Sequence, residues 1–445
     1  MINKFFFTIY ICILPCSVWG QKLWTFRECV DYAVEHSIDI KQQEIKMKNA
    51  EIALSLARNN RLPNLNAGSG QSLNFGRSQS QETGIYENRQ TSSISIAASS
   101  SIPLFSGFGL TNTIKQSKLN LLASIEGLKK AKNNLEVQIA FLYLDVLFKK
   151  EIIKIYESQF RQTLKQIERT VILVETGKVS ETQLLDIKAQ NARNEVEVIN
   201  AMNDLSMSLL NLSQVLNIEN KGFDIVQPGF LDDIIVEVLS LDFIYNEAMA
   251  IRPEVREAQY NLESGMKGVK VAQASGWPSL SLGLSYASGF SHIIKNIGDI
   301  DFEETNPMKQ LKNNQRQTIG LNLSFPIFNK YQVHNQIKLA KLTVDSRKLE
   351  LDNVKLELFK EIQQAYQRVV AAKAKYIATE KAVQASEKTF VYVQERYEMG
   401  KLTVYELSDA QMKLIGTQSA RLQAKYEYLF STKILEFYRG KVMNF

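Results

Sequence analysis

The chain has 445 residues and a formal net charge of +6, with only 21 glycines and 8 prolines. This composition favours long helices over a compact β-sandwich, and the chain lacks the dense basic clusters with interleaved aromatics that are typical of nucleic-acid-binding proteins. Its three histidines are widely scattered, and the sequence shows no Cys/His metal spacing, nucleophile elbow or phosphate loop. We therefore expect neither an enzyme nor a cofactor or metal site.

Residues 1–20 are predicted to be a secretory signal peptide. Lys4 precedes an apolar run that is too short to span a bilayer, and Gly20 is a small residue suited to the cleavage point. A lipoprotein signal ending at Cys16 is the alternative, although Pro15 directly before it matches the required small residue poorly. Cleavage would leave Cys29 as the last cysteine, which we interpret as a small buried apolar side chain. No later apolar run reaches 18 residues, so no transmembrane helix is expected.

The remaining chain is predicted to consist of two similar halves joined by a connecting segment, residues 219–240. The first half, residues 21–218, is expected to contain a helix at 24–60, strands at about 62–75 and 91–104, and a long helical hairpin at 107–215. The second half, residues 241–445, is expected to contain a helix at 242–275, strands at about 278–289 and 317–328, and a hairpin at 329–438.

The evidence for duplication is a constant offset between matching motifs. RLPNLNAGSG matches GWPSLSLGLS with an offset of 278 − 63 = 215 residues, and SIPLFSGFG matches SFPIFNKYQ with an offset of 326 − 103 = 223. The turns at Gly177 and Gly400 are also 223 apart, so the distance from PLF or PIF to the turn is 74 residues in both halves. If mostly helical, this segment would extend about 110 Å.

Two periodicities distinguish the helical segments from the strands. Apolar residues between 132 and 175 recur at steps of three, four or seven, which is typical of a coiled coil. Between the paired prolines the period is two, as in strands. The residues expected on one face are Leu280, Leu282, Leu284 and Tyr286, then Ile319, Leu321, Leu323 and Phe325, and less regularly Ile94, Ile96, Ala98 and Ile102.

Apolar residues facing small or polar ones suit a membrane β-barrel with a wet lumen, and a soluble half-buried sheet is the alternative. Aromatic residues at the strand ends favour a membrane interface; these are Phe105, Phe108, Trp277, Phe328 and Tyr331. The polar loops at about 76–89 and 290–316 are expected to face outside. Four strands cannot close a barrel, so three copies with twelve strands and twelve helices are expected.

The order, duplication and spacing of these features resemble the TolC-like outer-membrane efflux protein family over residues 22–440. The resemblance implies a mainly α protein with β-structure: a homotrimeric channel-tunnel with a 12-stranded outer-membrane β-barrel and a 12-helix periplasmic α-barrel. A mixed belt would include residues 218–240 and the C-terminal tail. The implied function is a passive outer-membrane duct of a tripartite efflux or type I secretion system, extending into the periplasm.

The resemblance also implies the functional residues and the partners. The hairpin tips, with Gly177, Lys178, Gly400 and Lys401, would dock onto a periplasmic adaptor and an inner-membrane pump of the RND or ABC type. The periplasmic constriction would comprise Glu406, Asp409, Tyr397, Gln183 and Asp186. Pro63, Pro103, Pro278 and Pro326 would mark the junction between barrel and helices.

Glu406 and Asp409, three residues apart on one helix face, would form acidic rings in a trimer. Alternatively they only solvate a helix start, where the helix dipole favours acids. Two positions depart from the family pattern, since Leu402 stands where a basic residue is expected and Gln183 where an acid is expected. We therefore expect closure through hydrogen bonds of Tyr397 and Gln183 in place of the family salt bridges.

The competing interpretation is a soluble periplasmic coiled-coil structural or adaptor protein. Such a protein would explain the heptads, but adaptors carry one hairpin per chain and this sequence carries two. The sequence leaves open whether the cargo is a drug, a metal ion, a siderophore or a protein, and to which families the pump and the adaptor belong.

Overall fold

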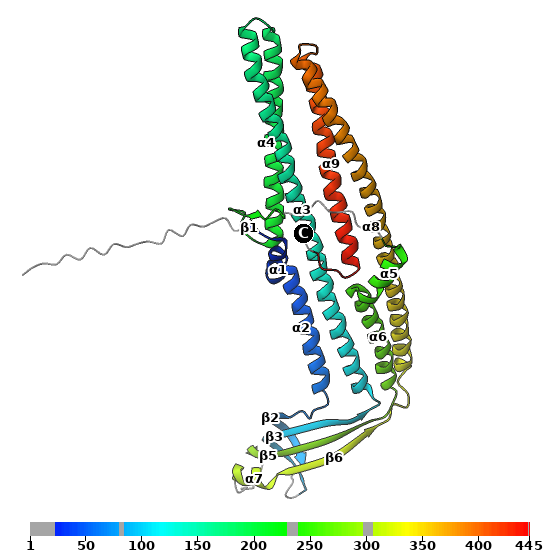
Figure 1. The fold of residues 1–445 in the computed structure, drawn as a ribbon. Helices are drawn as coiled ribbons and strands as arrows, with labels where there is room; N and C mark the ends of the chain where they lie inside the picture. Colours follow the sequence, from blue (N-terminus) through cyan, green and yellow to red (C-terminus); the bar gives the residue numbers. More distant parts are fainter. Residues whose placement is uncertain (1–22, 80–83, 229–238, 297–305, 444) are drawn as a thin grey trace, which may run out of the picture. The chain divides into compact units, whose positions relative to one another are not determined.

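The computed structural model describes residues 23–79, 84–228, 239–296, 306–443 and 445 (Figure 1). The predicted signal peptide, with Cys16, lies outside the described residues, as do residues 229–238 of the predicted connecting segment 219–240. The chain divides into two compact units. The first comprises residues 1–42, 130–252 and 358–445, and the second comprises 43–129 and 253–357. Each unit thus draws on both halves of the sequence.

Helices dominate both halves of the chain, and each helix of the first half has a counterpart in the second. The helices are α1 (Phe26–His36), α2 (Ile38–Asn59), α3 (Gly109–Glu175) and α4 (Glu181–Leu216), then α5 (Leu241–Ile251), α6 (Pro253–Ala274), the short α7 (Pro307–Asn313), α8 (Gln332–Glu398) and α9 (Val404–Tyr438). Helices α3 and α8 both have 67 residues, and α2 and α6 both have 22. At 1.5 Å per residue each long helix extends about 100 Å. None of the described helices is long and apolar enough to cross a membrane.

The structure corrects the two long helices predicted before the strands, residues 24–60 and 242–275. Each is broken into two. The first break is at Ser37, which has an extended backbone (φ −59°, ψ 129°) and closes α1. The second is at Arg252, because a residue before proline is excluded from the helical region and Pro253 follows. Pro253 marks the second break in the sequence, whereas no proline or glycine marks the first.

The second unit contains a four-stranded antiparallel sheet in the order β2-β3-β5-β6 (Figure 1). Its strands are β2 (Asn66–Gln79), β3 (Tyr86–Ser106), β5 (Ser279–Asn296) and β6 (Arg316–Ser324). Three of them extend further into the predicted loops than expected, and α7 lies within the predicted loop 290–316. Helix α7 begins where Asn306 caps the backbone N–H of Met308, and Pro307 is preorganised for the first turn.

The register of β5 and β6 collects apolar residues on one face. The facing pairs are Leu280 with Leu323, Leu282 with Leu321, and Leu284 with Ile319. Serine, glycine, asparagine and threonine occupy the alternate positions, including Ser281 opposite Asn322 and Gly283 opposite Gly320. All nine residues of β6 are exposed. The sheet therefore has one apolar and one small polar face, and β2 and β6 are its edges.

In the first unit a small core forms beside the middle of α3. The short strands β1 (Leu23–Trp24) and β4 (Asp224–Ile225) pair in parallel. The hydroxyl of Tyr143 donates to the carbonyl of Val226 at 2.7 Å, and Lys150 forms an ion pair with Asp224. Phe26 packs edge to face on Phe445. Cys29 is fully buried, as the sequence suggested. We call this part of the first unit, α1 with β1, β4 and the C-terminal tail, the belt elements.

Candidate functional site

The candidate site is the pair of turns that close the helical hairpins α3–α4 and α8–α9 of the first unit. In each turn the glycine adopts a left-handed backbone, with φ +66° at Gly177 and +73° at Gly400. The lysine that follows each glycine donates its backbone N–H to a carbonyl five residues earlier, Lys178 to Leu173 and Lys401 to Arg396. This is the Schellman arrangement, which glycine accommodates at the least cost. Both chain reversals are therefore encoded locally by the Gly-Lys pair.

Glu406 has a specific structural partner at the start of α9. Its carboxylate accepts the backbone N–H of Thr403 at 2.8 Å and the Thr403 hydroxyl at 2.9 Å, and the threonine oxygen in turn faces the backbone N–H of Glu406. This is a capping box, and its bonds hold the pKa of Glu406 below the usual value. The T-x-x-E pattern was present in the sequence and could have identified this role. The matching turn before α4 has Ser180 without a side-chain cap.

Asp409 lies one helical turn beyond Glu406 and forms an ion pair with Lys413 at 2.7 Å. The carboxylate raises the pKa of Lys413 through its hydrogen bond and its charge. Within one chain, therefore, Glu406 serves the helix cap and Asp409 is partly neutralised by a neighbouring ammonium.

Tyr397 packs inside its own hairpin. It is half-buried against an apolar cluster of Phe390, Leu407 and Ala410. Gln183 is half-buried and Asp186 is exposed, both on α4. In the described part of the chain no hydrogen bond joins Tyr397 to Gln183, so the predicted closing contact is absent within a single protomer. Whether it forms between neighbouring protomers stays a prediction.

An ion pair that the sequence analysis missed does join the two hairpins near their tips. Arg169 of α3 lies 3.1 Å from Glu398 of α8, and both side chains are about half exposed. Arg169 is eight residues before Gly177, whereas Glu398 is two before Gly400. Such a staggered pair has no signature in either helix alone, because each residue is an ordinary charge on a helical surface.

The four prolines of the predicted junction occupy two kinds of position in the second unit. Pro63, Pro278 and Pro326 lie outside the strands, between a strand and a helix. Pro103 instead lies within β3, which continues to Ser106. A register shift follows it, between Pro103 and Phe105. Proline has no backbone N–H, and it is tolerated in a strand at such an irregularity. The strand therefore continues two residues beyond its predicted end at residue 104.

Equivalent backbone and aromatic features precede both long helices. Residues 107 and 108 have φ of +59° and +64°, and residues 330 and 331, 223 positions later, have +53° and +59°. Phe105 and Phe108 pack edge to face at 5.4 Å between ring centroids, and Phe328 and Tyr331 do so at 5.8 Å. The duplication is thus retained in the left-handed pair and in the aromatic pair at each junction.

Across the ranges given above, no group of three or more His, Cys, Asp or Glu side chains is placed to hold a metal ion. The tips consist instead of two helix reversals with exposed lysines and acids.

Comparison with known proteins adds the following findings. The family model described as Outer membrane efflux protein matches residues 30–217 and 244–440. Outer membrane protein TolC of Escherichia coli (strain K12) is 20% identical over 394 residues, which is 84% of this chain and 74% of that protein. Probable outer membrane lipoprotein SilC of Salmonella typhimurium is 24% identical over 262 residues, 58% of this chain, and the match spans about half of that protein, 54%.

Solved structures share the fold at low identity. The outer membrane protein VceC of Vibrio cholerae has a TM-score of 0.76 and 16% identity, covering 93% of this chain and 96% of that one. The Campylobacter jejuni CmeC outer membrane channel has a TM-score of 0.74 and 19% identity, covering 93% and 84%.

Proposed function

Since this chain belongs to the outer membrane efflux protein family, we propose that three copies of it form a passive export duct that spans the outer membrane and the periplasm. The chain is an outer-membrane efflux channel, and its family consists of transport proteins, not enzymes. The finer parts of the proposal are the trimer, the shared barrel, the docking tips and the acidic constriction.

The open sheet is the observation that carries the trimer. In hydrocarbon an unpaired strand edge leaves backbone groups without partners, at a cost of several kcal/mol for each group. Edges β2 and β6 of one chain would be satisfied by β6 and β2 of its neighbours. Three four-stranded sheets then close a ring of twelve strands. The apolar face made by Leu282, Leu284, Ile319 and Leu321 would contact lipid, and the small polar face would line the lumen.

Exposed apolar residues on helices of the first unit also support association with further copies of the chain. On α8 the apolar residues Val370, Ile377 and Val391 are exposed and recur at multiples of seven. On α4, Leu185 and Ile199 are exposed with the same periodicity. Exposed heptad positions are typical of helices that pack against partners in a coiled coil. A monomer leaves both stripes in water, and a ring of protomers would bury them.

The aromatic residues at the junctions support placement at a membrane surface. Phe108, Trp277, Phe328 and Tyr331 are all more than half exposed. Large aromatic side chains are enriched where the hydrocarbon meets the headgroups. A soluble coiled-coil protein, the competing interpretation, would leave these rings and the apolar face of the sheet in water.

The decisive experiment is outer-membrane fractionation combined with the mass of the detergent-extracted protein. A trimer that fractionates with the outer membrane is the expected result. A monomer or dimer released from the periplasm by salt would contradict the duct and favour the soluble alternative.

We further propose that the hairpin tips, with Lys178 and Lys401 exposed beside the turns, dock onto a periplasmic adaptor and an inner-membrane pump. Crosslinking from cysteines placed at these two lysines tests this. Specific adducts with an adaptor co-expressed from the same cell envelope are expected. Adducts that form equally well from a cysteine at the distant, exposed Glu219 would contradict it.

The acidic constriction is tested by substitutions that separate charge from helix capping. Glu406→Gln removes the charge but keeps a side chain that can complete the capping box. Asp409→Asn removes the second charge, and Glu181→Gln, at the first turn of α4, is the matched control. If the acids form rings, both test substitutions lower the preference for cations in bilayer conductance. An unchanged preference in both would show that these residues only stabilise α9.

A further inference from the structure

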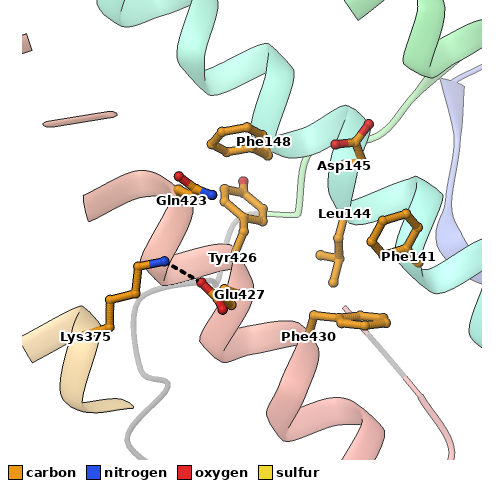
Figure 2. A pocket seen from close by; sticks show the side chains of 9 residues that line it. All are labelled: Phe141, Leu144, Asp145, Phe148, Lys375, Gln423, Tyr426, Glu427 and Phe430. Carbon is orange, nitrogen blue, oxygen red and sulfur yellow. Dashed lines mark hydrogen bonds and ion pairs between the residues drawn. The ribbon is translucent and has the colours of Figure 1, made fainter. Parts of the chain in front are cut away.

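A cavity of about 370 Å³ lies in the first unit among α3, α8 and α9 (Figure 2). Its apolar wall consists of Phe141, Leu144, Phe148, Tyr426 and Phe430. The rings are arranged in two tilted pairs, with centroids 5.6 Å apart for Phe141 and Phe430 and 6.0 Å apart for Phe148 and Tyr426. The volume falls in the range of roughly 300–1,000 Å³ found for small-molecule sites.

The polar wall of the cavity carries two carboxylates and one ammonium. Glu427 forms an ion pair with Lys375 at 2.8 Å, and Asp145 accepts a hydrogen bond from the neutral hydroxyl of Ser208 at 2.5 Å. Figure 2 shows the Lys375–Glu427 pair at one side of the cavity and Asp145 at the other. The charged lining therefore sums to one negative charge, which belongs to Asp145.

The face of α3 on which the cavity lies is turned away from the belt elements. Tyr143 and Lys150 contact β4 and its flanking backbone. At 3.6 residues per turn, Phe141, Asp145 and Phe148 lie on roughly the opposite side of the helix. In a tube whose wall is one helix thick and whose belt lies outside, this opposite face borders the bore. This step rests on the duct proposed above.

We propose that the cavity is a binding subsite for amphiphilic organic cations that pass through the duct. The faces of aromatic rings attract cations, and the structure already contains one such contact, with the ammonium of Lys149 5.7 Å from the centroid of the Phe148 ring. The carboxylate of Asp145 supplies the counter-charge, and it would repel an anion of the same shape. The Lys375–Glu427 pair is about half exposed on both sides, so it can separate at little cost to admit a ligand.

The test compares two ions of nearly the same shape and opposite charge. Purified protein in detergent is titrated calorimetrically with tetraphenylphosphonium and, separately, with tetraphenylborate, each against a blank of detergent alone. We expect saturable binding of the cation and none of the anion over the same concentration range. Asp145→Asn keeps an acceptor for Ser208 and should weaken cation binding about tenfold. Phe141→Ala should weaken it about threefold.

Tyr392→Ala is the matched control, because it removes an exposed aromatic residue of the same unit that does not line the cavity. Its binding should equal that of the wild type. Equal affinity for both ions, or cation binding that Asp145→Asn leaves unchanged, would overturn the inference. Bilayer conductance of the same preparations is measured separately. A conducting channel that binds no cation refutes this subsite alone, whereas a protein that forms no channel refutes the proposed function.

Discussion

Substituting alanine for Gly107 should destabilise the second unit strongly. Gly107 precedes α3 with φ +59°, and a Cβ there would lie 2.6 Å from the Cβ of Trp277 and 2.7 Å from the carbonyl oxygen of Ala274. The left-handed backbone costs a non-glycine residue about 1 kcal/mol. Inserting a methyl group against packed atoms adds about 1–3 kcal/mol. We therefore expect the free energy of unfolding to fall by about 2–4 kcal/mol.

Two further positions separate the backbone contribution from the steric one. Gly400 has φ +73°, and no atom lies within 4 Å of the place that a Cβ would occupy, so Gly400→Ala should cost only the backbone contribution of about 1 kcal/mol. Lys330 occupies the position equivalent to Gly107 in the second half, with φ +53°. Lys330→Gly should therefore relieve backbone strain and have the opposite sign, with a gain of at most about 1 kcal/mol.

The measurement is urea unfolding of the purified protein in detergent, followed by circular dichroism and by tryptophan fluorescence. Trp277 lies at the substituted contact, so its emission reports whether the indole moves. The difference between Gly107→Ala and Gly400→Ala isolates the steric contribution. If Gly107→Ala costs no more than Gly400→Ala, Trp277 and the backbone of Ala274 give way freely, and the reasoning from close approach is refuted.

Three other experiments test contacts within the first unit. Burial raises the pKa of Glu136, so its charged form destabilises the fold, and the free energy of unfolding falls as pH rises through the unfolded-state pKa. Glu136→Gln should therefore stabilise the protein at neutral pH. It should also flatten the pH dependence of stability, measured as urea midpoints from pH 4 to 8. Tyr426→Phe removes a 2.9 Å hydrogen bond to Glu151 and should cost about 1–2 kcal/mol by the same measurement, and no loss would show that water replaces it. A double-mutant cycle of Arg169→Ala and Glu398→Ala should give a coupling below about 1 kcal/mol that disappears at high salt, and a salt-independent coupling would contradict a solvated pair.

Several features of the chain were encoded by local sequence. The turns follow from Gly-Lys pairs, because a left-handed residue that closes a helix is a property of a few consecutive residues. The capping box of α9 likewise needs only Thr403 and Glu406, and its pattern is readable in the sequence alone. The equal lengths of α3 and α8 were visible as a constant offset of 223 between Gly177 and Gly400. In each case the determining contacts span few residues, or the information is a simple count along the chain.

Other features depended on which segments meet in three dimensions. The sheet extended β3 and β5 beyond the predicted strand ends, because pairing with a neighbour supplies hydrogen bonds that weak alternation does not reveal. The helix break at Ser37 also has no proline or glycine to mark it in the sequence.

The ion pair of Arg169 with Glu398 and the cavity between Asp145 and Glu427 join residues more than two hundred positions apart. A helical sequence specifies which of its faces is apolar, but not which partner helix that face meets or at what stagger. Sequence therefore determined the kind and order of most elements and the equal lengths of the two long helices. Tertiary packing decided the strand ends and the contacts between elements, because periodicity reflects a residue's own surroundings and does not identify its distant partner.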